Sequence, residues 1–118
     1  MSDDPIASAD STGSTDLPPS TDAPRIGPVL EELFAVLEGR RTASPEDSYT
    51  AKLLQGPQDK LLKKIAEESG EVIIAARDRD LDQIRYEVGD LFYHLLVVLV
   101  REGVTLDDLA AELADRRR

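Results

Sequence analysis

The sequence predicts an all-α domain built from four helices. Apolar residues recur every three to four positions between Val29 and Leu113, which is the spacing of one face of a helix. Helix start and stop residues bound these segments, among them Pro57, Gly103 and Thr105. No segment alternates apolar and polar residues as a half-buried strand does. A chain of 118 residues is long enough for one small domain of this kind.

The shorter elements are expected at the two ends of the domain. The first helix should run from Pro28 to Gly39, with one apolar face formed by Val29, Leu30, Leu33, Phe34, Val36 and Leu37. A loop should follow over residues 40–47, and residues 48–54 should form a short helical or irregular piece. Thr105 is expected to cap a short last helix, which extends through Leu113.

Two long helices should form an antiparallel hairpin at the centre of the domain. Pro57 is well placed to open one helix, which should end near Arg77. Its apolar side is expected to consist of Leu61, Leu62, Ile65, Val72, Ile73 and Ala76. The next helix should run from about Leu81 to Arg101. The polar stretch Asp78-Arg79-Asp80 separates the two and is the expected turn.

The second helix of this hairpin predicts a homodimer. Between Leu91 and Val100 it is apolar nearly all round, interrupted only by Tyr93 and His94. A four-helix chain of this size cannot easily bury a helix on every side. We therefore expect the helix at the centre of a dimeric helical bundle to which both chains contribute.

Residues 1–24 are expected to be a disordered acidic tail, and residues 25–118 to be the folded domain. The tail contains 17 Ser, Thr, Asp or Pro residues, and it has five Asp but no Lys or Arg. Such a segment cannot bury enough apolar surface to offset the entropy lost on ordering.

Composition argues against several classes of protein. The chain has no cysteine, which excludes disulfides, thiolate metal sites and cysteine nucleophiles. The lack of cysteine also fits a reducing compartment, and no signal peptide is visible, so a cytoplasmic location is expected. The net charge of −10 argues against general nucleic-acid binding. The longest apolar run, Leu95–Val100, is too short to span a membrane.

Five carboxylates are placed symmetrically about the expected turn. Glu67, Glu68 and Glu71 form an E-E-x-x-E run, and Glu87 and Asp90 form an E-x-x-D run. The midpoint between Glu71 and Glu87 is residue 79, and the midpoint between Glu68 and Asp90 is also residue 79. In an antiparallel hairpin the members of each pair therefore face each other, roughly 12–17 Å from the turn at about 1.5 Å per residue.

Carboxylates held this close raise one another's pKa unless a cation neutralises them. Mg²⁺ suits a site made only of oxygen ligands, and Mn²⁺ is possible. A single E-x-x-E run is usually a solvated acidic face with ordinary ion pairs. Two runs at equal distances from one turn, next to apolar positions, favour a metal site instead.

Basic and aromatic residues flank the carboxylates. Lys60 and Lys64 share the glutamate face and are candidates to hold phosphates, although an i,i+4 ion pair between Lys64 and Glu68 is the alternative. His94 lies one turn beyond Asp90, where it either orients Asp90 from behind the ligands, polarises a water, or is a satisfied core histidine. The chain has no Walker loop, nucleophile elbow or zinc spacing, which favours metal-activated water over a covalent intermediate.

Four strings of residues resemble a known family. They are Ser48–Leu54 (S-Y-T-A-K-L-L), Asp59–Glu68 (D-K-L-L-K-K-I-A-E-E), Glu71–Ala76 (E-V-I-I-A-A) and Asp90–Leu96 (D-L-F-Y-H-L-L). The two carboxylate runs resemble those of the all-α MazG-type nucleotide pyrophosphohydrolases. The first and last strings are similar to the phosphoribosyl-ATP pyrophosphohydrolases of histidine biosynthesis. The resemblance covers roughly residues 29–117.

This resemblance implies a homodimeric, MazG-like enzyme that hydrolyses the α–β phosphoanhydride of phosphoribosyl-ATP, a small-molecule nucleotide, to phosphoribosyl-AMP and pyrophosphate. It implies Mg²⁺ bound by Glu68, Glu71, Glu87 and Asp90. Glu67 and Glu68 are the expected catalytic residues, with Glu67 a ligand or a water-orienting base. Tyr49, Lys52, Lys60 and Lys64 are the expected substrate contacts. The alternatives are a house-cleaning (deoxy)nucleoside triphosphate pyrophosphohydrolase and a non-enzymatic helical dimerisation module.

Overall fold

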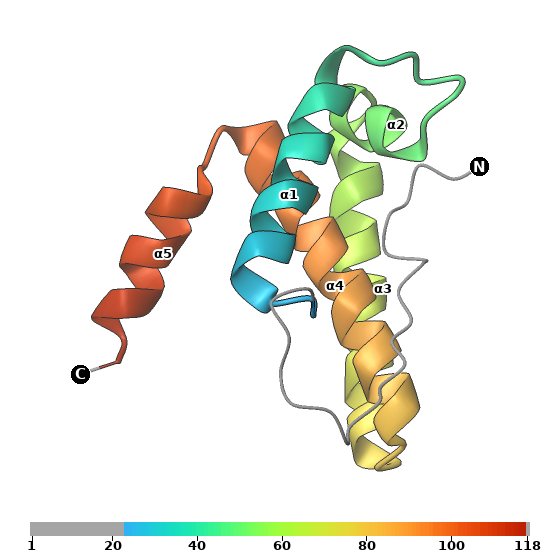
Figure 1. Ribbon diagram of the computed structural model, residues 1–118. Coiled ribbons are helices and arrows are strands. Elements are labelled where there is room, and N and C mark those ends of the chain that lie inside the picture. Colours follow the sequence, from blue (N-terminus) through green and yellow to red (C-terminus); the bar gives the residue numbers. More distant parts are fainter. Residues whose placement is uncertain (1–22, 118) are drawn as a thin grey trace.

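The computed structural model describes residues 23–117, and all regular structure in this part of the chain is helical (Figure 1). The α-helices are α1 (Ile26–Gly39), α2 (Tyr49–Gln55), α3 (Gln58–Arg77), α4 (Leu81–Glu102) and α5 (Leu106–Asp115), and a 3₁₀ turn, η2 (Arg40–Thr42), follows α1. The all-α prediction is confirmed. Residues 1–22 of the predicted disordered tail lie outside the described range.

The predicted count of four helices is one short, because residues 49–55 form a regular helix, α2. Its two turns are too short to show an apolar period in the sequence. Ser48 starts it by accepting a hydrogen bond from the backbone N–H of Ala51 at 3.0 Å. At the other end, the Arg101 guanidinium donates to the carbonyl of Leu53 at 2.7 Å, where a basic side chain is favourable. This bond attaches α2 to the end of α4.

Helices α3 and α4 lie side by side as a hairpin that turns at Asp78–Asp80 (Figure 1). Arg79 adopts the left-handed conformation, with φ of 56°. Its N–H and that of Asp80 donate to the carbonyls of Ala76 and Ala75, which is a Schellman helix stop. The Asp80 side chain then accepts from the N–H of Gln83 at 3.2 Å and starts α4. The turn therefore falls where the sequence predicts it.

The core is formed where α1, α2 and α3 pack against the second half of α4. Its buried members are Phe34, Leu37, Leu53, Leu61, Tyr93, Leu96, Val97 and Val100. Leu96 and Val97 thus face the core of their own chain. The outer side of the same helix is less covered, and Phe92 and Leu95 are 43 % and 40 % exposed.

The buried side of α3 matches its predicted apolar side only in part, since Leu61 is buried but Leu62 and Ile73 are exposed. Its buried residues are Leu61, Glu68 and Ala75, whereas Ile73 is 66 % exposed. The side turned toward α4 therefore includes a carboxylate, and part of the apolar side remains uncovered by the described residues. This exchange places Glu68 in contact with α4.

Helix α5 stands apart from the other helices (Figure 1). Gly103 ends α4 with φ of 80°, a conformation that glycine adopts without strain. Thr105 and Asp108 then form a reciprocal capping box at the start of α5. In the described part of the chain, no helix is both long enough and apolar enough to cross a bilayer.

Candidate carboxylate site

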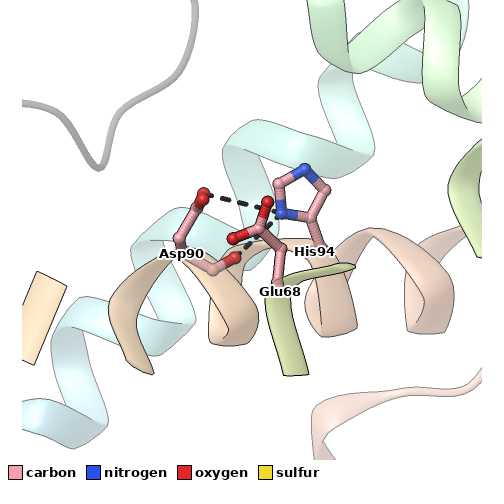
Figure 2. A group of neighbouring side chains, drawn as sticks. All are labelled: Glu68, Asp90 and His94. Carbon is pink, nitrogen blue, oxygen red and sulfur yellow. Dashed lines mark hydrogen bonds and ion pairs between the residues drawn. The ribbon is translucent and has the colours of Figure 1, made fainter. Parts of the chain in front are cut away.

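Three side chains of the α3–α4 hairpin come together at its centre (Figure 2). Glu68 approaches from α3, while Asp90 and His94 lie one turn apart on α4. One ligand atom from each residue lies within 4.8 Å of the other two. Glu68 and His94 are buried, and Asp90 is half-buried. The site is therefore a partly closed cluster with one open side at Asp90.

His94 is held on both of its ring nitrogens. Its Nδ1 lies 2.9 Å from the backbone carbonyl oxygen of Asp90 and 3.6 Å from Oδ1 of the same residue (Figure 2). Its Nε2 lies 3.1 Å from the hydroxyl of Tyr49, which comes from α2. The ring also packs edge-on against Tyr93, with 4.9 Å between centroids. These contacts fix the plane of the imidazole beside the two carboxylates.

Lys64 forms an ion pair with the buried glutamate. Its Nζ lies 3.3 Å from Glu68 and 3.8 Å from Glu67. Burial by itself lowers the pKa of Lys64, but Tyr49 and the two carboxylates favour the charged form and together hold the pKa above its ordinary value of 10.5. Lys64 is thus a stable cation at neutral pH that also lies near Tyr49.

The remaining carboxylates lie outside the close cluster. Glu87 is buried and accepts a hydrogen bond from the Gln83 amide at 2.8 Å. Glu71 is exposed, three residues after Glu68, and Glu67 is also exposed. The structure therefore brings Glu68 and Asp90 together, with Glu71 and Glu87 each one turn nearer the hairpin turn.

Two of the lysines that are predicted to contact the substrate line a common cavity. The cavity has a volume of about 320 Å³ and is lined by Pro45, Lys52, Gln55, Gly56, Pro57 and Lys60. Lys52 lies one turn after Tyr49 on α2, and Lys60 lies one turn before Lys64 on α3. The cavity therefore lies one helical turn from Tyr49 along α2 and one turn from Lys64 along α3.

Sequence reasoning missed two contacts that shape this region. Gln83 and Glu87 have the i,i+4 spacing of a helical amide–carboxylate pair, so that contact had a local signal. The hydroxyl of Thr50 hydrogen-bonds to that of Tyr93 inside the core. This second contact joins α2 to α4 and had no signal in the spacing of residues.

Fold and site together define an all-α protein with a paired-carboxylate centre on a helical hairpin, next to a lysine-lined cavity. The family model for phosphoribosyl-ATP pyrophosphohydrolase matches residues 30–117. The chain belongs to the phosphoribosyl-ATP pyrophosphohydrolase family.

Individual relatives agree with this assignment. A phosphoribosyl-ATP pyrophosphatase of Haloarcula marismortui is 47 % identical over 93 residues, which cover 77 % of this chain and 95 % of the relative. One of Nitrosomonas eutropha is 44 % identical, over 75 % of each chain. The histidine biosynthesis bifunctional protein HisIE of Synechocystis sp. is 49 % identical over 76 % of this chain and 42 % of its own length.

Proposed function

We propose that this chain hydrolyses phosphoribosyl-ATP to phosphoribosyl-AMP and pyrophosphate as a step of histidine biosynthesis. The observation that carries the proposal is the family match, which spans both helices of the hairpin and all five carboxylates. In the reaction, the oxygen of a water forms a bond to one phosphorus of the α–β linkage. The bridging P–O bond breaks, and the proton of the water passes to a base and then to solvent.

The residues at the centre of the hairpin fit a hard divalent cation. Glu68 and Asp90 supply carboxylate oxygens within 4.8 Å of each other, and Asp90 leaves one side open to a substrate. We propose that these two residues hold Mg²⁺, or Mn²⁺ in its place, with Glu71 and Glu87 as further ligands from the adjoining turns. When bound, the metal ion neutralises charge on the phosphate oxygens and makes the phosphorus more electrophilic.

The other residues of the site have separate roles in this proposal. Lys64 carries a fixed positive charge beside the cluster and attracts the triphosphate. Lys52 and Lys60 line the adjoining cavity, which has room for a further phosphate. Glu67 is exposed at the rim and accepts the proton of the attacking water.

We also propose that the protein acts as a cytoplasmic homodimer. Support comes from the apolar surface that the described residues leave uncovered on α3 and α4, which includes Ile73 and Phe92. A second copy of the same hairpin would cover these side chains in a two-fold arrangement.

A substrate comparison tests the proposed activity. The purified chain is incubated with Mg²⁺ and either phosphoribosyl-ATP or each deoxynucleoside triphosphate, and pyrophosphate release is measured. We expect kcat/KM for phosphoribosyl-ATP to exceed the others by about 10²-fold or more, since polar contacts to the extra phosphoribosyl group discriminate strongly. A Glu68→Gln protein is the matched control for contaminating hydrolases.

The other outcomes assign the chain differently. Equal or faster hydrolysis of the deoxynucleotides would indicate a house-cleaning enzyme. If no substrate releases pyrophosphate and circular dichroism shows intact helices, the chain is instead a non-enzymatic helical dimerisation module. Activity that persists unchanged in excess EDTA would contradict the metal proposal.

A further inference from the structure

Two consecutive residues of α2, Tyr49 and Thr50, contact two consecutive residues of α4 in reverse order. The Tyr49 hydroxyl meets His94, and the next residue, Thr50, meets Tyr93. Each contact joins one member of the S-Y-T string to one member of the Y-H string. Tyr49 and His94 are 45 positions apart in the chain, and Thr50 and Tyr93 are 43 positions apart. The two strings therefore form the two sides of one hydrogen-bonded contact between helices.

The geometry around His94 determines which nitrogen carries the proton. Nδ1 faces two oxygens of Asp90, the backbone carbonyl at 2.9 Å and the carboxylate at 3.6 Å. A carbonyl and a carboxylate only accept hydrogen bonds, so Nδ1 must carry the proton. In the neutral ring Nε2 is then an acceptor, and the Tyr49 hydroxyl at 3.1 Å must donate to it.

We infer that Tyr49 is a positioning residue: it donates to Nε2 and so holds the His94 ring, in the Nδ1–H tautomer that the Asp90 carbonyl sets, beside the carboxylate of Asp90, a proposed metal ligand. The inference rests on the proposed function only in taking Asp90 as a metal ligand. It gives Tyr49 a role different from the substrate contact that the sequence predicts. It also keeps His94 outside the set of metal ligands, because one of its nitrogens is protonated and the other accepts from Tyr49.

This arrangement couples the position of α2 to the carboxylate cluster. The centroid of the Tyr49 ring lies 6.0 Å from that of His94 and 6.5 Å from that of Tyr93. Ring packing therefore holds the Tyr49 side chain in addition to its hydrogen bond. Losing the hydroxyl removes the hydrogen bond from Tyr49 to Nε2 of the ring. We expect the imidazole to turn more freely and Asp90 to be less well placed. Loss of a group that orients a metal ligand typically weakens metal affinity by 10- to 100-fold.

His94 is the single histidine of the chain, so its ring can be observed without assignment. Metal-free protein labelled with ¹⁵N at histidine is studied by NMR at pH 8. We expect a protonated Nδ1 and an unprotonated Nε2 that shows the shift of a hydrogen-bond acceptor. In Tyr49→Phe, the Nε2 resonance should move toward that of a free acceptor nitrogen. The Mg²⁺ concentration for half-saturation, followed by calorimetry, should rise about tenfold.

Thr50→Val is the matched control, because it also removes one hydroxyl from the contact between α2 and α4, and that hydroxyl bonds to Tyr93. In this variant the Nε2 resonance and the Mg²⁺ concentration for half-saturation should both stay near the values of the unaltered protein. A second pair guards against a poorly folded Tyr49→Phe. His94→Asn, which keeps a donor near the Nδ1 position, should retain more Mg²⁺ affinity than His94→Gln.

Two results would overturn the inference. One is a proton on Nε2 of the unaltered protein, whether or not Nδ1 is also protonated. The other is a Tyr49→Phe protein that raises KM for phosphoribosyl-ATP while the His94 resonances and Mg²⁺ binding stay unchanged, which would make Tyr49 a substrate contact. Neither the NMR nor the calorimetry uses the substrate, so a failure of the proposed activity would be seen separately.

Discussion

Glu68 is the residue at which stability and function oppose each other. Its carboxylate is buried within reach of a second carboxylate, Asp90, and a buried charge is costly unless it is paired. The Lys64 ammonium, with Nζ 3.3 Å from the Glu68 carboxylate, offsets part of this cost. An apolar residue at position 68 would pack against α4 without any such cost. Residues that break the ordinary rules of burial in this way are expected at functional sites.

Conservative replacement of the carboxylates should therefore separate activity from folding. We expect Glu68→Gln, Glu71→Gln and Asp90→Asn each to reduce turnover by about 10²-fold or more, because stabilisation of developing charge is usually a large part of catalysis. The free energy of unfolding without metal should stay equal or rise, since each change removes repulsion between like charges. Steady-state kinetics at saturating Mg²⁺ and urea unfolding measure the two quantities.

Glu112→Gln is the matched control for these variants. Glu112 pairs with Arg116 on the surface of α5, outside the carboxylate cluster, and an exposed pair of this kind contributes little to stability. Its replacement should change neither quantity. Near-normal turnover in all three site variants would remove the carboxylates from the mechanism.

The approach of Glu68 to Asp90 could be predicted from the sequence, because mirror spacing about residue 79 requires only a hairpin with regular helices. The contact of Tyr49 with His94 could not. It depends on how α2 lies across α4, and that orientation follows from packing and from the Arg101 bond to the end of α2. The spacing of residues along the sequence cannot predict such a contact.

At the scale of elements, helical periodicity predicts which residues form helices better than it predicts which side is buried. The pattern of α3 places Leu62 and Ile73 on the covered side, yet both are exposed in the described chain. Apolar residues mark a surface that some partner covers, whether that partner is the same chain or another one. The sequence of α3 therefore combines two sides, one for the site and one left for a further contact.

The turn between α3 and α4 carries strain that one substitution should relieve. Arg79 is exposed and has φ of 56°, a conformation that costs a residue with a Cβ about 1 kcal/mol or more. Arg79→Gly should raise the free energy of unfolding by about 0.5–1 kcal/mol, because the relief of strain exceeds the added entropy of glycine in the unfolded chain. Thermal unfolding at fixed protein concentration measures the change.

Asp78→Gly is the control at the neighbouring position. Asp78 has φ of −80°, where glycine relieves nothing and only adds entropy to the unfolded chain, so this variant should be equally or less stable than the unaltered protein. A lower melting temperature for Arg79→Gly, with Asp78→Gly unchanged, would show that the Arg79 side chain contributes more than its backbone costs.

For the whole molecule, the outer face of α4 is the clearest sign of a larger assembly. Leu81, Val88, Phe92 and Leu95 lie within about 60° of one another at roughly 100° per residue. The side chains of the site lie on another side of the same helix, at positions 87, 90 and 94. An apolar stripe of this length on an exposed helix is typical of a helix–helix interface.

The prediction of a dimer can now be tested at positions that do not belong to the core of one chain. Phe92→Asp and Leu95→Asp should shift sedimentation at micromolar concentration from a dimer toward a monomer, because a charge in a dimer interface would be buried without a partner.

Val97→Asp, by contrast, should unfold the chain, since Val97 is fully buried within it and an unpaired buried charge costs several kcal/mol of a total stability of about 5–15 kcal/mol. Val36→Asp is the matched control: Val36 on α1 is 39 % exposed, close to the 40 % of Leu95, but it lies off this stripe and should leave the dimer intact. If the unaltered protein sediments as a stable monomer at micromolar concentration, the apolar stripe has another partner and the homodimer is refuted.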